Sequence, residues 1–294
     1  MATDLLILIS LLAWGAWGIF EKKALDSASP QEICIALFTL SVLQIPVLLL
    51  LLSLLQPGGW QLAPPVMFWS LVSGSGYVVA VLSYLVVLKH VDASFVYGFT
   101  AGYPVVAVLG AILILGEPFV LSRLLGIFIV VGGIYAIGSS PLSSTKKAEP
   151  DSKRLWAMSL LVLTTFCFGM RGVVDKIAVN YGQPLEIFLG KSIWDALFLV
   201  LIFVVFKRRG YDLPLRSGRM WFYCFLSSLM LSVGGISYLF AMNRCAVSYV
   251  VGITSCYPLI MYALALVFLK ERFNRLRLCG IVLLISGLLV IRFC

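Results

Sequence analysis

Charged residues are scarce in this chain, and their scarcity excludes a water-soluble fold. Asp, Glu, Lys and Arg make up 12% of the 294 residues, hydrophobic residues make up 61%, and the mean hydropathy is +1.05. Soluble domains carry about a quarter charged residues. Because a transmembrane helix needs about 20 apolar residues, the chain has room for roughly ten spans and for no extramembrane domain.

Residue patterns for catalysis and metal binding are missing as well. The chain has one histidine, His90, and its seven cysteines show no CxxC or Cys/His spacing. It has no GxxxxGK[ST] loop and no GxSxG elbow, so the sequence gives no support for ATP-driven pumping or membrane-embedded hydrolysis. We therefore expect no enzyme, no cofactor and no metal site. The net charge of +9 lies in short loops instead of on a basic face, so we expect no nucleic-acid partner.

Apolar stretches of helical length fill the chain and are bounded by polar residues or by Pro and Gly. The ten stretches run over residues 5–22, 32–55, 66–88, 94–115, 121–138, 155–176, 185–206, 219–241, 248–269 and 276–293. Because they are continuously apolar, helices are favoured over a barrel. The hydrophilic segment 139–154 is typical of a linker, so we expect five-helix units at 1–138 and 155–294.

The two units are copies of each other at an offset of 154 residues. Identical pairs include Gly15/Gly169, Lys22/Lys176, Pro30/Pro184, Glu32/Glu186, Tyr84/Tyr238, Tyr103/Tyr257, Pro104/Pro258 and Gly133/Gly287. A unit with an odd number of helices leaves its copy inverted in the bilayer. The sequence therefore predicts an all-α membrane protein of ten helices, as two inverted repeats around a central cavity. This architecture favours alternating access, although duplication can also build a channel or a scaffold.

The chain carries the short motifs Trp14-Gly15, Tyr103-Pro104 followed by Glu117-Pro118, and their repeat at Tyr257-Pro258 and Glu271. With these motifs it resembles the drug/metabolite transporter superfamily, specifically its EamA-type ten-helix branch. The resemblance implies a basket of ten helices around a cavity, and a substrate among amino acids, drugs, nucleotide sugars and other metabolites. It also implies cytoplasmic termini, whereas the Lys and Arg of the odd-numbered loops place both termini outside. The orientation stays open.

Three ionisable residues inside the spans are candidates for substrate binding, because charge in a bilayer is costly. Lys191 and Asp195 lie four residues apart in the seventh span and can pair as ions on one helix face. Such a pair either serves the substrate or only fixes packing, and Asp195 is the candidate for proton coupling. Arg171 replaces Trp17 of the first unit, and is suited either to hold an anionic group or to snorkel to the interface.

Aromatic residues of both units complete the predicted site. Their rings offer apolar and cation–π contacts, and phenols add hydrogen bonds. We assign to the cavity Trp14, Trp17, Tyr84, Tyr103, Tyr238 and Tyr257. Pro104 and Pro258 interrupt the fourth and ninth spans and are candidate hinges or static kinks. Glu21 and Asp175 are equivalent residues at helix ends, and their repetition favours a structural or gating role.

The sequence as a whole predicts a secondary transporter in the inner or plasma membrane. We expect it to move a small polar or amphipathic metabolite, such as an amino acid or drug-like solute, and the resemblance favours export. Its expected partners are this solute and the lipid bilayer. Proton or ion coupling stays open, and we expect a monomer or weak dimer. The alternatives are a lipid-linked sugar or nucleotide-sugar transporter or flippase, and a non-transporting channel or scaffold.

Overall fold

The computed structural model describes residues 2–56, 59–116, 121–141, 151–211, 215–245, 250, 253–254 and 256–293. This part of the chain is helical and contains no strand, as the sequence predicts. The helices are α1 (Ala2–Ala24), α2 (Pro30–Leu43), α3 (Ile45–Leu55), α4 (Pro64–His90), α5 (Ala93–Thr100), α6 (Tyr103–Leu115), α7 (Leu121–Ser139), α8 (Asp151–Ala178), α9 (Pro184–Arg208), α10 (Gly218–Arg244), α12 (Tyr257–Phe268) and α13 (Arg275–Phe293).

Seven helical stretches of the described chain are long and apolar enough to cross a membrane. Two shorter apolar helices, Phe128–Ile137 and Tyr257–Phe268, accompany them. The stretch Pro30–Leu55 contains both α2 and α3, and Ala93–Leu115 contains both α5 and α6. Sequence reasoning treated residues 32–55 as one unbroken span, whereas in residues 94–115 it expected a hinge or kink at Pro104. Each resumed helix has a proline in its first turn, where the backbone N–H groups have no intrahelical partner.

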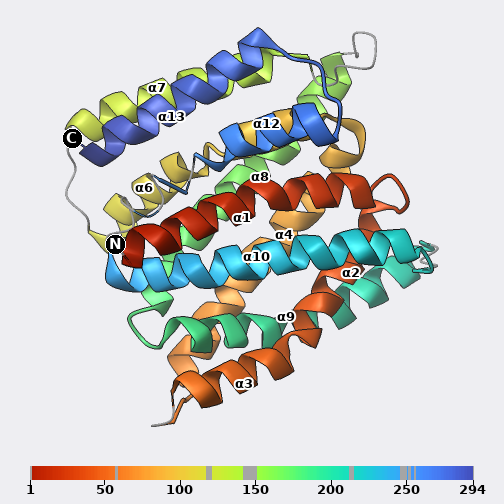
Figure 1. Ribbon diagram of the computed structural model, residues 1–294, viewed down its shortest axis with the longest axis vertical. Coiled ribbons are helices and arrows are strands. Elements are labelled where there is room, and N and C mark those ends of the chain that lie inside the picture. Colours follow the sequence, from red (N-terminus) through yellow and green to blue (C-terminus); the bar gives the residue numbers. More distant parts are fainter. Residues whose placement is uncertain are drawn as a thin grey trace.

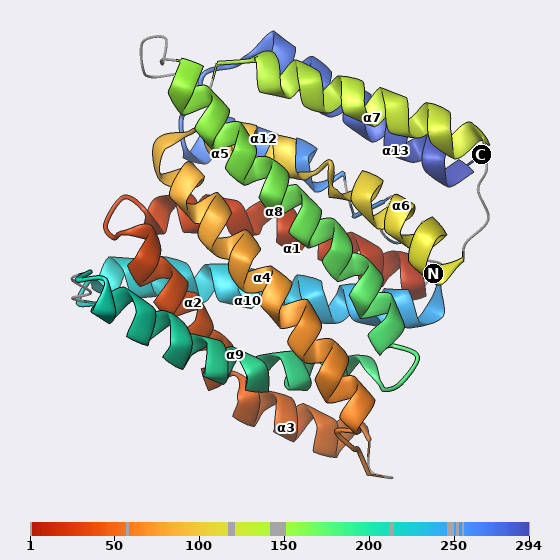
Figure 2. The same cartoon turned by 180° about the vertical axis from the view of Figure 1, so that it is seen from behind.

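The helices form a stack with the α7–α13 pair at one end and α3 at the other (Figure 1). In the middle of the stack, α1 lies along α10, and behind them α4 packs against α8 (Figure 2). Each of these two pairs joins a helix of the first half of the chain to a helix of the second half. The buried core lies between the pairs and draws on both halves.

Contacts between the two halves of the chain come in matching pairs. In the second contact of each pair, every residue is replaced by its counterpart in the other half. Ser10 Oγ in α1 donates a hydrogen bond to the Gly234 carbonyl at 2.9 Å. The equivalent Thr164 Oγ1 in α8 donates to the Ala80 carbonyl at 3.5 Å, and both positions differ from the first pair by 154 residues. A second such couple consists of Gln61 N–H with Glu186 Oε1 at 3.1 Å and Leu215 N–H with Glu32 Oε1 at 3.3 Å.

Glycines set the distance between α7 and α13. A Cβ on Gly133 would lie 2.6 Å from the Gly280 carbonyl oxygen, and one on Gly287 would lie 2.6 Å from that of Gly126. These two contacts are again a matching pair, related by the offset of 154 residues. Because the contact register rises along α7 as it falls along α13, the two helices run antiparallel. Only glycine permits so close an approach of two backbones.

Candidate functional site

One cavity of about 160 Å³ lies between the two halves of the chain. Side chains from α1, α2, α4, α8, α9 and α10 line it, and α6 and α12 each contribute one tyrosine. All nine residues that the sequence assigned to the site lie on its wall, namely Trp14, Trp17, Tyr84, Tyr103, Arg171, Lys191, Asp195, Tyr238 and Tyr257. Their role in binding a substrate stays a prediction.

A buried ion pair joins α8 to α9 on the cavity wall. Lys191 Nζ lies 2.6 Å from Asp175 Oδ1, and both side chains are less than a tenth exposed. The expected pairing of Lys191 with Asp195 is therefore wrong. Asp175 lies on the facing helix, where it reaches Lys191 across the helix contact, and its other donor is the Ser73 hydroxyl at 2.7 Å. Lys191 therefore pairs with a residue of the neighbouring helix and not with a residue of its own helix.

Arg171 keeps part of its hydrogen-bonding capacity for the cavity. Its guanidinium carbon lies 4.4 Å from the centre of the Tyr77 ring, which is a cation–π distance. Its Nε donates to Ser73 Oγ at 3.3 Å and is 4.0 Å from Asp175 Oδ2, too long for a hydrogen bond. The side chain is 27% exposed, so it faces the cavity instead of snorkelling to a membrane surface.

Asp195 belongs to a second cluster of polar side chains, which lies where α9 packs against α2. Its carboxylate accepts a short hydrogen bond from the hydroxyl of Ser41. Gln44 Nε2 donates to Ser41 Oγ at 3.2 Å and to Ser192 Oγ at 3.1 Å, and Gln44 Oε1 accepts from Ser232 at 2.6 Å. Ser41 and Asp195 are equivalent positions, 154 residues apart. A residue that contacts its own counterpart lies where the two halves meet.

Aromatic rings close the cavity on the side of α1. Trp14 packs against Tyr238 with ring centres 5.1 Å apart, and Trp17 packs against Tyr257 at 5.9 Å. Each contact joins a tryptophan of the first half to a tyrosine of the second. Such rings suit the apolar part of an amphipathic solute.

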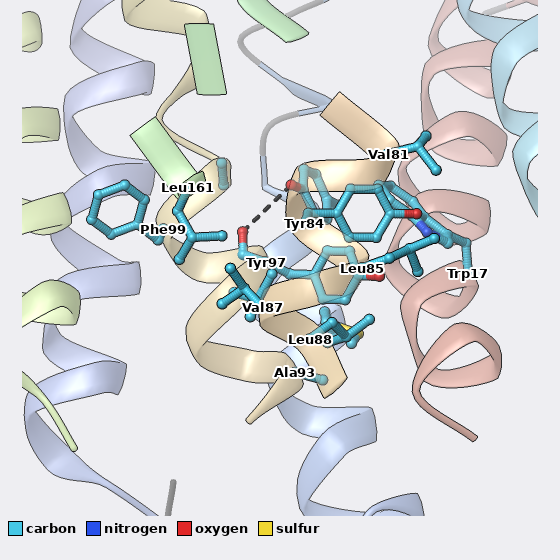
Figure 3. Close-up of a cluster of buried hydrophobic side chains, with 14 of the residues drawn as sticks. Trp17, Val81, Tyr84, Leu85, Val87, Leu88, Ala93, Tyr97, Phe99 and Leu161 are labelled. Atoms are coloured by element: carbon cyan, nitrogen blue, oxygen red, sulfur yellow. Dashed lines mark hydrogen bonds between the residues drawn. The ribbon is translucent and has the colours of Figure 1, made fainter. Parts of the chain in front are cut away.

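Glu21 lies behind this aromatic wall, and sequence reasoning left it out of the site. It is fully buried, and its Oε2 accepts hydrogen bonds from Trp17 Nε1, Tyr84 OH and Tyr97 OH, each at 2.7 Å. Figure 3 shows the rings of these three donors gathered in one buried cluster. The available signal was the spacing Trp17/Glu21, which repeats as Arg171/Asp175.

Pro104 and Pro258 lie in the first turns of α6 and α12, directly after Tyr103 and Tyr257 of the cavity wall. At these positions a proline costs no intrahelical hydrogen bond. The two segments pack on α8 and α1 through equivalent residues: a Cβ on Gly169 would lie 2.7 Å from the Tyr103 carbonyl oxygen, and one on Gly15 would lie 3.5 Å from that of Tyr257. A hinge function for both prolines stays a prediction.

Outside the cavity, a buried ionic cluster ties together three chain connections. Arg277 is 1% exposed, its Nη1 lies 3.2 Å from Asp92 and 3.4 Å from Glu271, and its Nη2 donates to the Pro141 carbonyl at 2.6 Å. Burial raises the pKa of the Glu271 carboxyl, and the neighbouring Asp92 charge raises it further. The equivalent side chains of the first half, Arg123 and Glu117-Pro118, lie outside the described side chains.

Comparisons with known proteins agree with this architecture. A search of protein families matches residues 1–139 and, separately, residues 155–293 to the EamA-like transporter family. One solved structure, described as "Crystal structure of protein", aligns with 99% of this chain and 98% of its own, at a TM-score of 0.72 and 14% identity. That likeness concerns the fold alone. A search of curated proteins finds no match.

Proposed function

Because the chain belongs to the EamA-like transporter family of integral membrane proteins, we propose that it is a secondary transporter of a small zwitterionic solute, such as a neutral amino acid. The charges on the cavity wall carry this proposal. Lys191 and Asp175 neutralise each other at 2.6 Å, which leaves the guanidinium of Arg171 and the carboxylate of Asp195 for a ligand. A carboxylate of the solute binds Arg171, and its ammonium group binds Asp195.

Cavity size favours a small solute over the alternative substrates. A buried water needs about 10–15 Å³ of such space, so about 160 Å³ suits a solute of roughly ten non-hydrogen atoms. A nucleotide sugar or a lipid-linked sugar is several times larger. The aromatic wall of Trp14, Trp17 and Tyr238 suits an apolar side chain on the same molecule. An aromatic or large aliphatic amino acid satisfies all three features.

Exchange-related contacts support a mechanism of alternating access. The couples Ser10–Gly234 with Thr164–Ala80, and the antiparallel α7–α13 contact, are contacts that two inverted repeats about one axis would make. In such a pair each half can adopt the conformation of the other, so that a central site opens to either face in turn. The hydrogen bond between Ser41 and its own counterpart Asp195 is a contact that such an axis would produce. We infer ten spans in total, with outward movement of solute as the family resemblance implies.

Ligand-induced thermal stabilisation of the purified protein tests the binding site, because a ligand of the folded state raises its melting temperature. The probes are L-phenylalanine, phenethylamine, which lacks the carboxylate, and 3-phenylpropionate, which lacks the ammonium group. We expect the amino acid to stabilise most. Arg171→Ala should remove its advantage over phenethylamine, and Asp195→Asn should remove its advantage over 3-phenylpropionate. Equal stabilisation of wild type and both variants would contradict the assignment.

Counterflow in proteoliposomes tests transport itself. Vesicles loaded with unlabelled L-phenylalanine should take up the labelled amino acid transiently, and Arg171→Ala should weaken half-saturation by about tenfold or more, as expected for a charge-assisted hydrogen bond. Arg219→Ala is the matched control, because Arg219 is exposed and contacts Tyr223 away from the cavity. A channel would conduct without the counterflow transient, and a scaffold would give no uptake.

A further inference from the structure

We propose that Glu21 is the carboxylate that binds and releases a proton during the transport cycle, so that the solute is coupled to a proton gradient. This inference rests on the proposed transport function and goes beyond it. It assigns the coupling to a residue outside the cavity wall, in place of Asp195. The observation that points to it is a fully buried carboxylate whose hydrogen-bond partners, within the described part of the chain, are all neutral.

The cage of Glu21 draws on three other parts of the fold. Trp17 Nε1 reaches Oε2 from one turn earlier in α1, Tyr84 OH reaches it from α4, and Tyr97 OH reaches it from α5, each at 2.7 Å. Ser227 Oγ of α10 donates to Oε1 at 3.2 Å. Each half of the chain therefore supplies at least one donor. A change in the packing of the halves changes these hydrogen bonds directly.

Hydroxyl partners allow Glu21 to exist in both protonation states. Tyrosine and serine hydroxyls can donate to an ionised carboxylate, and they can also accept from a protonated one by rotating their hydrogen. Three of the four partners of Glu21 are of this kind. A proton arriving on the carboxylate therefore leaves no charge unpaired and no buried acceptor unsatisfied. When the proton leaves, the ionised carboxylate keeps the four donors of the cage, which stabilise its charge by hydrogen bonds.

The equivalent carboxylate, Asp175, cannot make the same change. Its close partner Lys191 is an ammonium group with donors only, 2.6 Å away and buried. Protonation of Asp175 would leave this cation buried without a counter-charge, which is strongly unfavourable. The two halves thus carry one carboxylate held by a cation and one held by amphoteric groups. Only the second is suited to repeated proton exchange.

No cation replaces the neutral cage among the described residues that face Glu21. Lys22 turns its ammonium group to the carbonyl oxygens of Leu88 and Val91, and Lys23 lies over the rings of Tyr223 and Phe268. Other titratable groups of the described chain around this cage are the thiols of Cys34 and Cys224 and the phenol of Tyr77, and Tyr257 donates to the Tyr97 carbonyl. The ionic residues of the cavity wall are the pair Lys191–Asp175, Arg171 and Asp195.

Two cage members connect Glu21 to the solute. Trp17 and Tyr84 lie on the cavity wall with one face while they donate to Glu21. A solute that packs against these rings shifts their N–H and O–H groups relative to the carboxylate. The hydroxyl of Tyr84 also gives the proton a path between Glu21 and the cavity. Substrate and proton therefore influence each other through shared side chains instead of by direct contact.

Infrared difference spectroscopy of the detergent-purified protein tests proton binding without any substrate. The carbonyl stretch of a protonated, buried carboxylic acid should appear as the pH is lowered, and it should be absent from Glu21→Gln. Glu32→Gln is the matched control, because Glu32 is a buried carboxylate that caps α2 outside the cavity. A band that persists unchanged in Glu21→Gln would overturn the proposal.

Proteoliposomes test the coupling, with labelled L-phenylalanine as the probe. A pH difference of one unit can drive at most about tenfold accumulation for one proton per solute. Wild type and Glu32→Gln should approach this limit. Glu21→Gln should not accumulate the solute, so that its concentrations inside and outside stay about equal. Each value is normalised to counterflow in the same vesicles. Equal normalised accumulation by Glu21→Gln would refute the proposal. If wild type gives no counterflow, the proposed solute class is wrong, and the infrared result decides the role of Glu21.

Discussion

At the first turns of α2 and α9, the two halves of the chain make the same hydrogen bonds with equivalent residues, whereas one helix earlier the equivalent carboxylates Glu21 and Asp175 have different partners. Glu32 accepts from the N–H of Ser29 at 2.9 Å, and Glu186 accepts from that of Gln183 at 2.8 Å. By contrast, hydroxyl and indole groups surround Glu21, and an ammonium group holds Asp175.

The difference separates the parts of the molecule that define the fold from the parts that define its chemistry. Contacts that hold helices together recur in both halves, because both halves must fold and pack in the same way. On the cavity wall the substitutions Trp17/Arg171, Leu37/Lys191 and Ser41/Asp195 place all the added charge on the second half. A solute in this cavity therefore meets an apolar, aromatic side and an ionic side.

The largest expected effect comes from removing the charge of Asp175. Asp175→Asn should destabilise the protein by about 3–5 kcal/mol, because the buried Lys191 then lacks its counter-charge. Glu21→Gln should cost far less, since its cage contains no cation. Thermal unfolding in detergent, with both variants in parallel, measures the contrast.

A second substitution checks the cause. Lys191→Leu installs the residue found at the equivalent position 37, and in the Asp175→Asn background it should recover most of the lost stability. If the double variant is no more stable than Asp175→Asn, the ion pair is not the reason for the loss.

Contacts that both halves share could be predicted from the sequence, whereas most contacts in which the halves differ could not. The offset of 154 residues predicted that Tyr84 is equivalent to Tyr238, and Gly133 to Gly287. The two members of each couple occupy corresponding places in the fold. Identity between halves reports a common packing role. All nine assigned site residues line one cavity for a similar reason, since costly polar and aromatic groups in spans face the interior.

Ion-pair and hydrogen-bond partners on neighbouring helices could not be predicted from the sequence. The i, i+4 rule correctly brings Lys191 and Asp195 to one face of α9, but it cannot say that Asp175 of α8 reaches Lys191 first. The cage of Glu21 needs α4, α5 and α10 to converge on the end of α1, and no spacing within a single helix reports that convergence. The break at Gln44 was equally hidden in an unbroken apolar run, whereas Pro104 marked the break at Gly102 in advance.

Glycines of the α7–α13 contact give the second prediction, which probes the symmetric part. Gly133→Ala and Gly287→Ala should each destabilise by about 1–3 kcal/mol, because the new Cβ would lie 2.6 Å from a backbone oxygen of the facing helix. The two losses should be equal, since the positions are equivalent. Gly132→Ala is the control, with no atom within 4 Å of its Cβ, and should leave the melting temperature unchanged or raise it. Unequal losses would show that the two halves pack differently here.

The smallest expected effect concerns the capping carboxylates, where the halves agree most closely. Glu32→Gln and Glu186→Gln should each cost about 1 kcal/mol, because the amide keeps one acceptor oxygen but loses the charge that strengthens the bonds to the backbone. Each carboxylate also accepts from a backbone N–H of the other half, Leu215 for Glu32 and Gln61 for Glu186. The double variant should therefore lose the sum of the two single effects, since the sites are separate. A loss confined to one variant would mean that the two halves differ in stability even where their contacts match, and that the asymmetry of the cavity extends to the scaffold.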